Sequence, residues 1–247
     1  MKALVLAAGY ATRLYPLTKE YPKPLLKAGR KYIIDYIIDK LDRIDGIHEI
    51  VVVTNSKFIP HFKAWAKKLE TKKPVTLVDD LTTSLEDRRG AIGDMHFAIN
   101  KKRIKEDLLV IGGDNLFDGD IKGFLRFARA HKNSPVIGLY DIAKKAAARN
   151  YGVVKVNSGY QVVDFQEKPA HPRSTLVAMC LYYFPAEKLE LIGDYITRKA
   201  GKHDATGFYI DWLRKKTQVF GFVFKGKWFD IGDHKFYNQA KEEFSNA

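Results

Sequence analysis

The stretch "LAAGYATRLYPLTKEYPKPLL", residues 6–26, decides how the rest of this chain is interpreted. It continues the apolar run 2–8, which predicts a buried parallel strand ending just before Gly9. Small residues after a strand let backbone N–H groups approach a phosphate, and the planar fork of Arg13 can grip two phosphate oxygens. Prolines on both sides of Lys23 restrict the backbone and would hold its ammonium at one point. The stretch therefore predicts a phosphate site, with an ordinary connector carrying surface cations as the alternative.

Strand and helix patterns alternate through the first half of the chain. This alternation predicts one α/β domain with a mostly parallel sheet and right-handed crossovers. After residue 150 the pattern changes to a hairpin, further strands and shorter helices, which would extend or cover that sheet with antiparallel additions. The expected strands are 2–8, 49–55, 74–80, 107–115, 135–142, 174–185, a hairpin over 151–169, and a strand pair or one long bent strand over 217–232; the expected helices are 32–44, 58–69, 93–103, 121–132, 207–216 and 234–247.

Composition limits the class of protein. The chain has 247 residues and 46% hydrophobic content, enough for one large core. Its one cysteine, Cys180, excludes an internal disulfide and favours a reducing compartment. The apolar run near the N-terminus is too short for a signal peptide, and no stretch approaches the length of a membrane span. We therefore expect a soluble, cytoplasmic protein with no membrane partner.

The net charge has several explanations. Lys and Arg total 42 against 29 Asp and Glu, which gives +13. Such a charge suits nucleic-acid binding, an enzyme for anionic small substrates, or a solubilising surface rich in lysine. The paired lysines are scattered along the sequence rather than clustered, at 67–68, 72–73, 101–102, 144–145 and 215–216. This scatter favours the solubilising surface, and we expect no nucleic-acid partner.

Two aspartates are candidate metal ligands. Asp114, in "GGDN", ends the strand expected over 107–115, and ligands of open α/β sheets lie at the carboxyl ends of strands. Mg²⁺ takes one or two protein carboxylates together with substrate phosphates. Asp230, in "WFDIG", is the second candidate, whereas Asp118, Asp120 and Asp233 are better suited to turns and caps. An Asx-turn or helix cap is also the alternative for Asp114.

The segment "FQEKP", residues 165–169, adds a third charged motif at the end of an expected strand. Lys168 could bind a phosphate and Glu167 could accept hydroxyl groups of a sugar, with a surface ion pair as the alternative. The turns 9–13 and 112–115 should line one crevice, since both follow parallel strands. Trp228 could stack on a sugar or base, although core packing is the more common use of such a residue.

In this order, "LAAGYATRLYPLTKEYPKPLL", "GDN", "YGVV…EKP" and "WFDIG" resemble the sugar-1-phosphate nucleotidyltransferases, such as the glucose-1-phosphate thymidylyl- and uridylyltransferases. The resemblance covers nearly the whole chain. It implies a Rossmann-like α/β fold, with a mostly parallel central sheet flanked by helices and antiparallel sugar-binding additions in the second half. It also implies a single nucleotidyltransferase domain over 1–247, with a nucleotide-binding half (1–142) and a sugar-binding half (143–247).

The resemblance assigns a role to each candidate residue. Arg13 and Lys23 would be catalytic, holding the triphosphate and the α-phosphate. Asp114 and Asp230 would hold Mg²⁺, the implied cofactor. Nucleotide contacts would come from Ala8, Gly9, Thr12, Arg13 and Gly90, and contacts to the sugar and its phosphate from Gly152, Glu167 and Lys168.

The implied reaction joins a nucleoside triphosphate to a sugar-1-phosphate. The sugar phosphate oxygen attacks the α-phosphorus in line and pyrophosphate leaves, so charge cancellation and positioning do most of the work. No general base is needed, because a phosphate with a second pKa of about 6 is already ionised at neutral pH. We expect dTTP or UTP with a hexose-1-phosphate. The alternatives are a cytidylyltransferase acting on phosphocholine or another phosphomonoester, a nucleic-acid-binding module, and a nucleotide sensor without activity.

Three positions depart from the family pattern. Ala11 stands where the first loop usually has a second glycine, and its methyl group should be tolerable only if φ is below zero. The segment 79–94 lacks the glutamine often used to recognise a pyrimidine, so the choice of base is open. Cys180 stands where many relatives have a glycine in the sugar pocket, so the acceptor could differ from glucose-1-phosphate. The oligomeric state is also open, with a homo-oligomer as one option.

Overall fold

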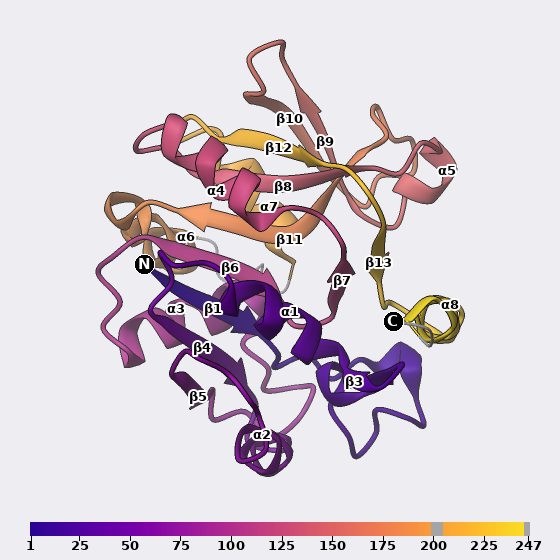
Figure 1. The fold of residues 1–247 in the computed structure, drawn as a ribbon. Coiled ribbons are helices and arrows are strands. Elements are labelled where there is room, and N and C mark those ends of the chain that lie inside the picture. Colours follow the sequence, from indigo (N-terminus) through magenta and orange to yellow (C-terminus); the bar gives the residue numbers. More distant parts are fainter. Residues whose placement is uncertain (199–204, 245–247) are drawn as a thin grey trace.

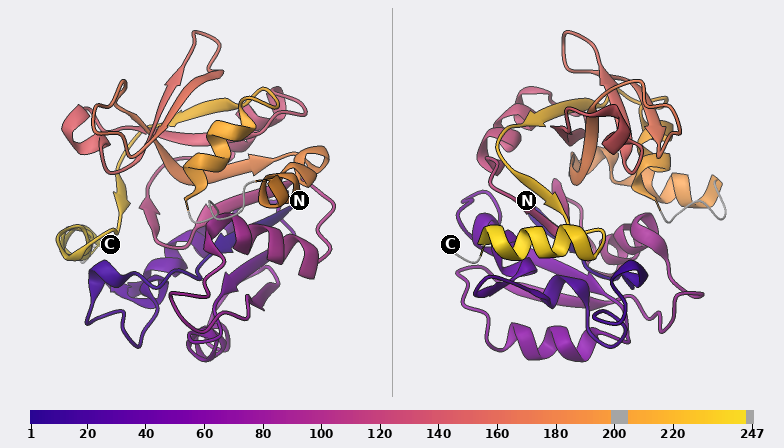
Figure 2. Two further views of the ribbon diagram at one scale, coloured as in Figure 1. Left: turned by 180° about the vertical axis from the view of Figure 1, so that it is seen from behind. Right: turned by 90° about the vertical axis from the view of Figure 1, so that its right-hand side faces the viewer.

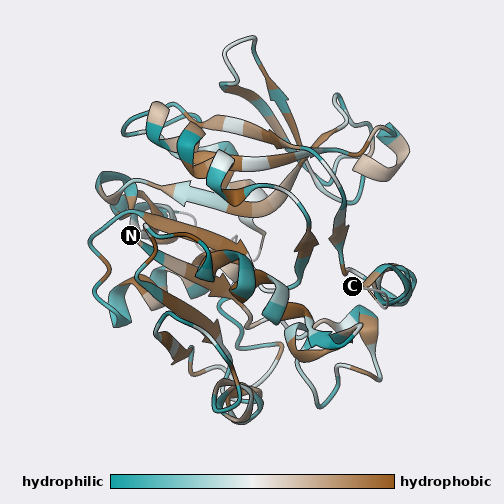
Figure 3. Ribbon diagram, viewed as in Figure 1, coloured by the Kyte–Doolittle hydropathy of each residue, from teal (hydrophilic) through white to brown (hydrophobic). Residues whose placement is uncertain are grey.

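Four parallel strands form one side of a nine-stranded sheet (Figure 1). The structure is a computed structural model, and it describes residues 1–198 and 205–244. The strands are rich in Val, Ile and Leu; three of them are largely buried, because helices cover both faces of the sheet, and the edge strand at residues 75–79 is partly exposed. In Figure 3 the ribbon of this part of the sheet is largely brown, the colour of hydrophobic residues. Their order is β6 (Leu108–Gly112), β1 (Lys2–Leu6), β4 (Glu49–Thr54) and β5 (Val75–Asp79).

Strands from the second half extend this sheet. The link is β11 (Leu176–Phe184), which pairs antiparallel with β6 on one side and with β8 (Val136–Asp141) on the other. The expected hairpin is confirmed as β9 (Gly152–Val156) and β10 (Val162–Glu167). The segment 217–232 forms two strands that enter different sheets. These are β12 (Phe220–Phe224), parallel to β8, and β13 (Trp228–Asp230), antiparallel to β7 (Asn115–Phe117).

The helices form a layer on each face of the sheet. The core cluster on one face includes side chains from α1 (Ile33–Asp42), α2 (Ile59–Ala66) and α4 (Ile121–Ala130). The cluster on the other face includes α3 (Gly90–Lys101), α6 (Glu190–Arg198) and α7 (Thr206–Leu213). The predicted helices are confirmed to within a few residues, whereas α6 was not predicted. The remaining elements are short: η1 (Thr12–Leu14), η2 (Lys23–Leu25), β2 (Lys27–Ala28), β3 (Lys31–Tyr32), α5 (Lys145–Ala148) and η3 (Ala186–Lys188).

The last helix, α8 (His234–Phe244), packs against the N-terminal loops. Figure 2 (right) shows it crossing in front of the indigo segment. Tyr237 and Ala240 are buried in a cluster with Leu14 and Ala28, and the Tyr237 hydroxyl donates to the Lys27 carbonyl oxygen at 2.9 Å. Asp233 caps the helix by accepting a hydrogen bond from the Phe236 N–H at 3.0 Å, as its turn-like context suggested.

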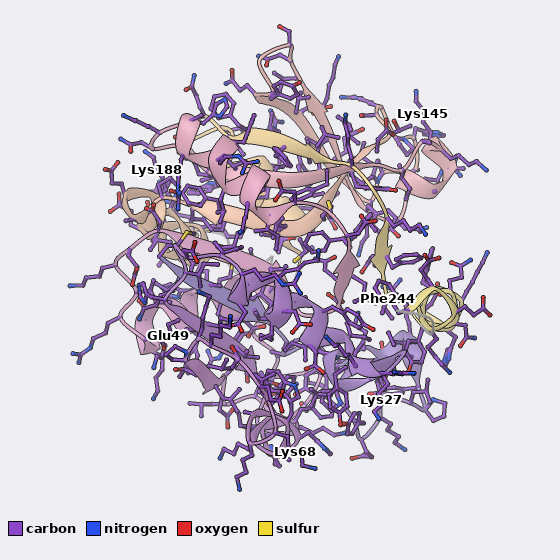
Figure 4. All side chains as sticks on the ribbon, viewed as in Figure 1. Lys27, Glu49, Lys68, Lys145, Lys188 and Phe244 are labelled. Atoms are coloured by element: carbon purple, nitrogen blue, oxygen red, sulfur yellow. The ribbon has the colours of Figure 1, made fainter. Side chains whose placement is uncertain are left out.

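The positive charge is spread over the surface. The labelled lysines Lys27, Lys68, Lys145 and Lys188 point outward from different edges of the molecule in Figure 4. This distribution agrees with the scatter of lysine pairs in the sequence. Within residues 1–198 and 205–244, no helix combines the length and the apolar character needed to span a bilayer.

Asn115 ties three strands together, and its replacement should destabilise the fold. Its side chain is 3% exposed; its amide nitrogen donates to the Met179 carbonyl oxygen at 2.5 Å, and its oxygen accepts from the Trp228 indole at 2.9 Å. Asn115→Ala leaves both partners buried without a hydrogen bond, so we expect the free energy of unfolding to fall by about 2–3 kcal/mol. Urea denaturation measures this, with the exposed Asn150→Ala as the control. Equal denaturation midpoints for Asn115→Ala and the unmodified protein would contradict it.

Candidate active site

A cavity of about 230 Å³ lies at the carboxyl ends of β1 and β6. Leu6 and Gly112, which are paired neighbours at the ends of these strands, both line it. The turns after the two strands, 9–13 and 112–115, contribute residues to this one cavity, as predicted. The lining residues are Leu6, Ala7, Ala8, Gly9, Ala11, Lys23, Pro24, Asp80, Arg88, Gly90, Ala91, Asp94, Gly112, Asp114 and Cys180.

Polar side chains brace the first loop from behind. The buried Asn55 side chain donates to the Ala8 carbonyl oxygen at 2.9 Å, and Thr54 donates to that of Ala7 at 3.2 Å. The buried Thr18 hydroxyl donates to the Ala11 carbonyl oxygen at 2.8 Å. Sequence reasoning missed these residues. The sequence carries a signal for two of them: Thr54 and Asn55 stand at the end of a buried strand. Polar side chains at that position lie near the carboxyl ends of the neighbouring strands.

The expectation for Ala11 was wrong. Its φ is 47° and its ψ is 45°, the left-handed conformation that glycine adopts without strain. An L-residue with a side chain loses roughly 1–2 kcal/mol in this region. The Thr18 hydrogen bond and a second one from the Leu14 N–H to the Ala11 carbonyl oxygen, at 2.9 Å, hold the residue there. The methyl group is therefore tolerated because tertiary contacts enforce the turn.

The predicted nucleotide residues fall into two groups. Ala8, Gly9 and Gly90 line the cavity. Gly90 has a φ of 72° at the start of α3, so a larger residue would be strained there. Thr12 and Arg13 lie on the exposed η1 and do not line the cavity. Asp80, Arg88 and Asp94 also line the cavity, and they were not among the predicted site residues.

Lys23 joins the two segments that carry the candidate metal ligands. Its ammonium donates to the Asp114 carboxylate and, at 2.8 Å, to the carbonyl oxygen of Ile231, the residue after Asp230. The pairing of β13 with β7 places Asp230 opposite Asn115, next to Asp114 in the chain. The two aspartates, predicted from motifs in opposite halves of the sequence, therefore lie at one place.

Further predicted residues influence the ionisation of Asp230 through their charges. Burial and the negative charge of Asp114 raise the pKa of Asp230. The positive charges of Lys23, Arg13 and Lys168 act in the opposite direction. The guanidinium of Arg13 also faces Gly232, where an added Cβ would lie 3.4 Å from its Nη2 atom. Cations from the first loop and from the "EKP" motif thus act electrostatically on Asp230.

The donor set fits a hard divalent cation. Carboxylate oxygens are the ligands that Mg²⁺ prefers, and the ammonium of Lys23 already stands in as a cation beside Asp114. Across the described residues, no three His, Cys, Asp or Glu side chains converge to form a complete metal cage. Two carboxylates with the remaining ligands from water or substrate match the way proteins hold Mg²⁺.

The second group of predicted residues lies around Glu167. Gly152 is its paired neighbour in the β9–β10 hairpin, and an added Cβ on Gly152 would lie 3.3 Å from Glu167 Oε2. A Cβ on Gly207, at the start of α7, would lie 1.8 Å from the same oxygen, so only glycine fits there. Burial raises the pKa of Glu167, and the adjacent Lys168 counteracts this. The contact with Gly207 was not predicted.

The contacts of Trp228 and the burial of Cys180 bear on the roles predicted for them. The indole of Trp228 donates to Asn115, and its ring lies 5.4 Å from Tyr140 and 5.3 Å from Tyr151, which favours the packing interpretation. Cys180 lines the cavity with a φ of 53°, at the point where the register of β11 against β8 shifts. Burial raises the pKa of its thiol to about 12, so the group is protonated at neutral pH.

Asp230→Asn should stabilise the metal-free protein in a pH-dependent way. In the unfolded chain the carboxyl has its ordinary pKa of about 3.8, and in the folded protein the pKa is higher. Ionisation therefore favours unfolding above pH 3.8, and the penalty grows until the pH exceeds the folded-state pKa. The substitution removes a penalty of about 1–3 kcal/mol at pH 8 and nothing below pH 3.8.

Thermal denaturation in EDTA at both pH values measures this difference. The exposed Asp45→Asn is the matched control and should change little at either pH. A lower melting temperature for Asp230→Asn at pH 8 would show that the carboxylate is held by net attraction.

Comparison with known proteins places the chain among nucleotidyl transferases, whose family model matches residues 2–246. The bifunctional protein GlmU of Methanocaldococcus jannaschii is 30% identical over 237 residues, and GlmU of Methanococcus aeolicus is 29% identical over 233 residues. Each match covers 94% of this chain and 51% of the relative. The chain thus spans about half the length of the curated relatives it matches.

Solved structures share the fold. A Bacillus anthracis protein assigned as a glucose-1-phosphate thymidylyltransferase has a TM-score of 0.81 at 21% identity, over 100% of this chain and 96% of that chain. UDP-glucose pyrophosphorylase complexed with UDP-glucose has a TM-score of 0.83 at 20% identity, over 99% of this chain and 98% of that chain. These likenesses confirm the predicted α/β fold, with its mostly parallel central sheet flanked by helices.

Proposed function

The chain belongs to the nucleotidyl transferase family, and we propose that it converts a nucleoside triphosphate and a sugar-1-phosphate to a nucleoside diphosphate sugar and pyrophosphate. The observation that carries this proposal is the ion pair of Lys23 with Asp114, close to Asp230, on which the positive charges of Lys23, Arg13 and Lys168 act. Two anionic reactants must meet in this reaction, so their mutual repulsion has to be cancelled. Three cations beside a carboxylate pair that can hold a metal meet that need.

The nucleotide would occupy the cavity. Its α-phosphate has to lie near Lys23 and the carboxylate pair, so the nucleoside would contact other lining residues, among them Gly90 and Asp94. Backbone groups of Ala8 and Gly9 would contact it from the loop, with Thr12 and Arg13 reaching the triphosphate from η1. The exposed position of Arg13 suits a group that takes its partner only when the triphosphate is bound.

The acceptor would bind on the side of Gly152, Glu167 and Lys168. The carboxylate of Glu167 accepts no hydrogen bond from another residue in the described part of the chain, so its oxygens can take hydroxyl groups of a sugar. Lys168 would bind the acceptor phosphate. Its positive charge also acts to lower the pKa of Asp230. This places the phosphate of the acceptor beside the α-phosphate of the nucleotide.

The chemical step then needs positioning rather than a base. An oxygen of the acceptor phosphate, ionised at neutral pH, forms a bond to the α-phosphorus while the bond to the pyrophosphate oxygen breaks. Arg13 and Lys23 stabilise the negative charge on the leaving group and the reacting phosphate. Asp114 and Asp230 would hold Mg²⁺, which supplies charge neutralisation and orients the triphosphate when bound.

We propose dTTP or UTP as the nucleotide and a hexose-1-phosphate as the acceptor. The fold shared with a UDP-glucose complex supports a uridine nucleotide and a hexose. The half-buried carboxylate of Glu167 supports a hydroxyl-rich acceptor over phosphocholine, which has no hydroxyl group to donate.

A screen of pyrophosphate release tests this function. Each nucleoside triphosphate is paired with a panel of sugar-1-phosphates and with phosphocholine, in the presence of Mg²⁺. We expect turnover with UTP or dTTP and a hexose-1-phosphate. Turnover with CTP and phosphocholine alone would establish the cytidylyltransferase alternative, and no turnover with any pair would refute the proposal.

Arg13→Ala should lower kcat/KM by on the order of 100-fold or more, because it removes a charge partner of the leaving pyrophosphate. The matched control is Arg30→Ala, another exposed arginine, in the turn between β2 and β3, which should keep near-normal activity. Steady-state kinetics with the best substrate pair from the screen measures both. A near-normal rate for Arg13→Ala would exclude this residue from the mechanism.

A further inference from the structure

The ammonium of Lys23 lies against Asp114, one of the two candidate metal ligands. It donates to Asp114 Oδ2 and to the carbonyl oxygen of Ile231, so it bridges the end of β6 and the end of β13. The Lys23 side chain is 15% exposed and that of Asp114 is 29% exposed, so the pair is shielded but within reach of solvent. A cation bound by Asp114 and Asp230 would lie between the same two strand ends.

We propose that Lys23 is an internal counter-cation that competes with the divalent metal for Asp114, and that metal binding displaces its ammonium toward the phosphates. The inference rests on the metal site of the proposed function. It adds that Lys23 has two successive partners. Before the metal binds, its ammonium pairs with Asp114, and after the metal binds, its ammonium contacts a phosphate.

Charge explains why the ammonium lies there in the nucleotide-free protein. Asp114 and the almost fully buried Asp230 are like charges at one place, and the Asp230 carboxylate accepts no hydrogen bond from the described residues. Two carboxylates without a cation nearby would be strongly unfavourable. The ammonium supplies the countercharge. A divalent cation bound to Asp114 would repel an ammonium on the same carboxylate, so metal binding weakens the Lys23–Asp114 pair and favours displacement of the ammonium.

The restricted backbone around Lys23 limits the proposed displacement to the Lys23 side chain. Pro22 and Pro24 restrict the backbone, and Leu25 and Leu26 close the η2 turn with N–H bonds to the carbonyl oxygens of Pro22 and Lys23, at 3.0 Å each. The flexible four-carbon stem can therefore swing while the backbone stays in place. The nearest acceptors for a displaced ammonium would be phosphate oxygens in the cavity that Lys23 lines. Metal and triphosphate should thus favour each other's binding.

Mn²⁺ binding to the nucleotide-free protein tests the competition. Free Mn²⁺ is followed by electron paramagnetic resonance during titration of the unmodified protein and of Lys23→Met. Removing the ammonium should tighten Mn²⁺ binding at least tenfold. Lys23→Arg keeps a positive charge and should bind Mn²⁺ no more tightly than the unmodified protein. Lys19→Met removes an exposed lysine from the same loop and should change nothing.

Equal or weaker Mn²⁺ affinity in a folded Lys23→Met protein would overturn the proposal. No Mn²⁺ binding by either protein would also overturn it, and would remove the metal site itself, whereas failure of the proposed function shows separately in the pyrophosphate screen. A second measurement needs no variant. In the unmodified protein, the nitrogen-15 signal of the hydrogen-bonded Lys23 ammonium should shift or vanish when Mg²⁺ is added, and an unchanged signal at saturating Mg²⁺ would refute the displacement.

Discussion

The pairing of β13 with β7 is the constraint on which the candidate site depends. It brings Asp230 and Ile231, from the end of the chain, against the turn that carries Asp114. Asn115 secures this pairing from inside by bonding both to the indole of Trp228 and to the backbone of β11. The parallel sheet supplies the cavity, but the second carboxylate and the carbonyl oxygen that holds Lys23 come only through this short antiparallel contact.

Several features of the site lower the stability of the folded protein. A buried aspartate beside another aspartate, and residues such as Ala11 and Cys180 in left-handed conformations, are unfavourable in themselves. Each is held by contacts around it: cations near Asp230, the Thr18 hydroxyl at Ala11, and the Asn115 side chain at the β11 irregularity. Such strain and unbalanced charge gather where a protein binds or transforms a ligand. In this molecule Ala11 and Cys180 line one cavity, and Asp230 lies close to Asp114, which lines the same cavity.

Much of this arrangement could be predicted from the sequence, for identifiable reasons. The apolar runs of β1, β4 and β6 and the stripe of α1 are periodic signals that tertiary packing did not alter. Arg13, Lys23 and Asp114 stand at strand ends or in rigid turns, where topology alone brings side chains together. The φ of Ala11, the bracing by Asn55 and Thr18, and the contact of Gly207 with Glu167 could not be predicted, because each depends on residues distant in sequence. The split of residues 217–232 between two sheets has the same cause.

The late position of β13 in the chain has a consequence for synthesis on the ribosome. The strands β1, β4, β5 and β6, together with the braced first loop, are complete once the first 115 residues have emerged. The partner strand that brings Asp230, and the helix that clamps the loops near Leu14, are translated much later. A nascent chain can therefore form most of the cavity lining, including Asp80, Asp94 and Asp114, before Asp230 has been synthesised, so the carboxylate pair of Asp114 and Asp230 can come together only after translation has passed β13.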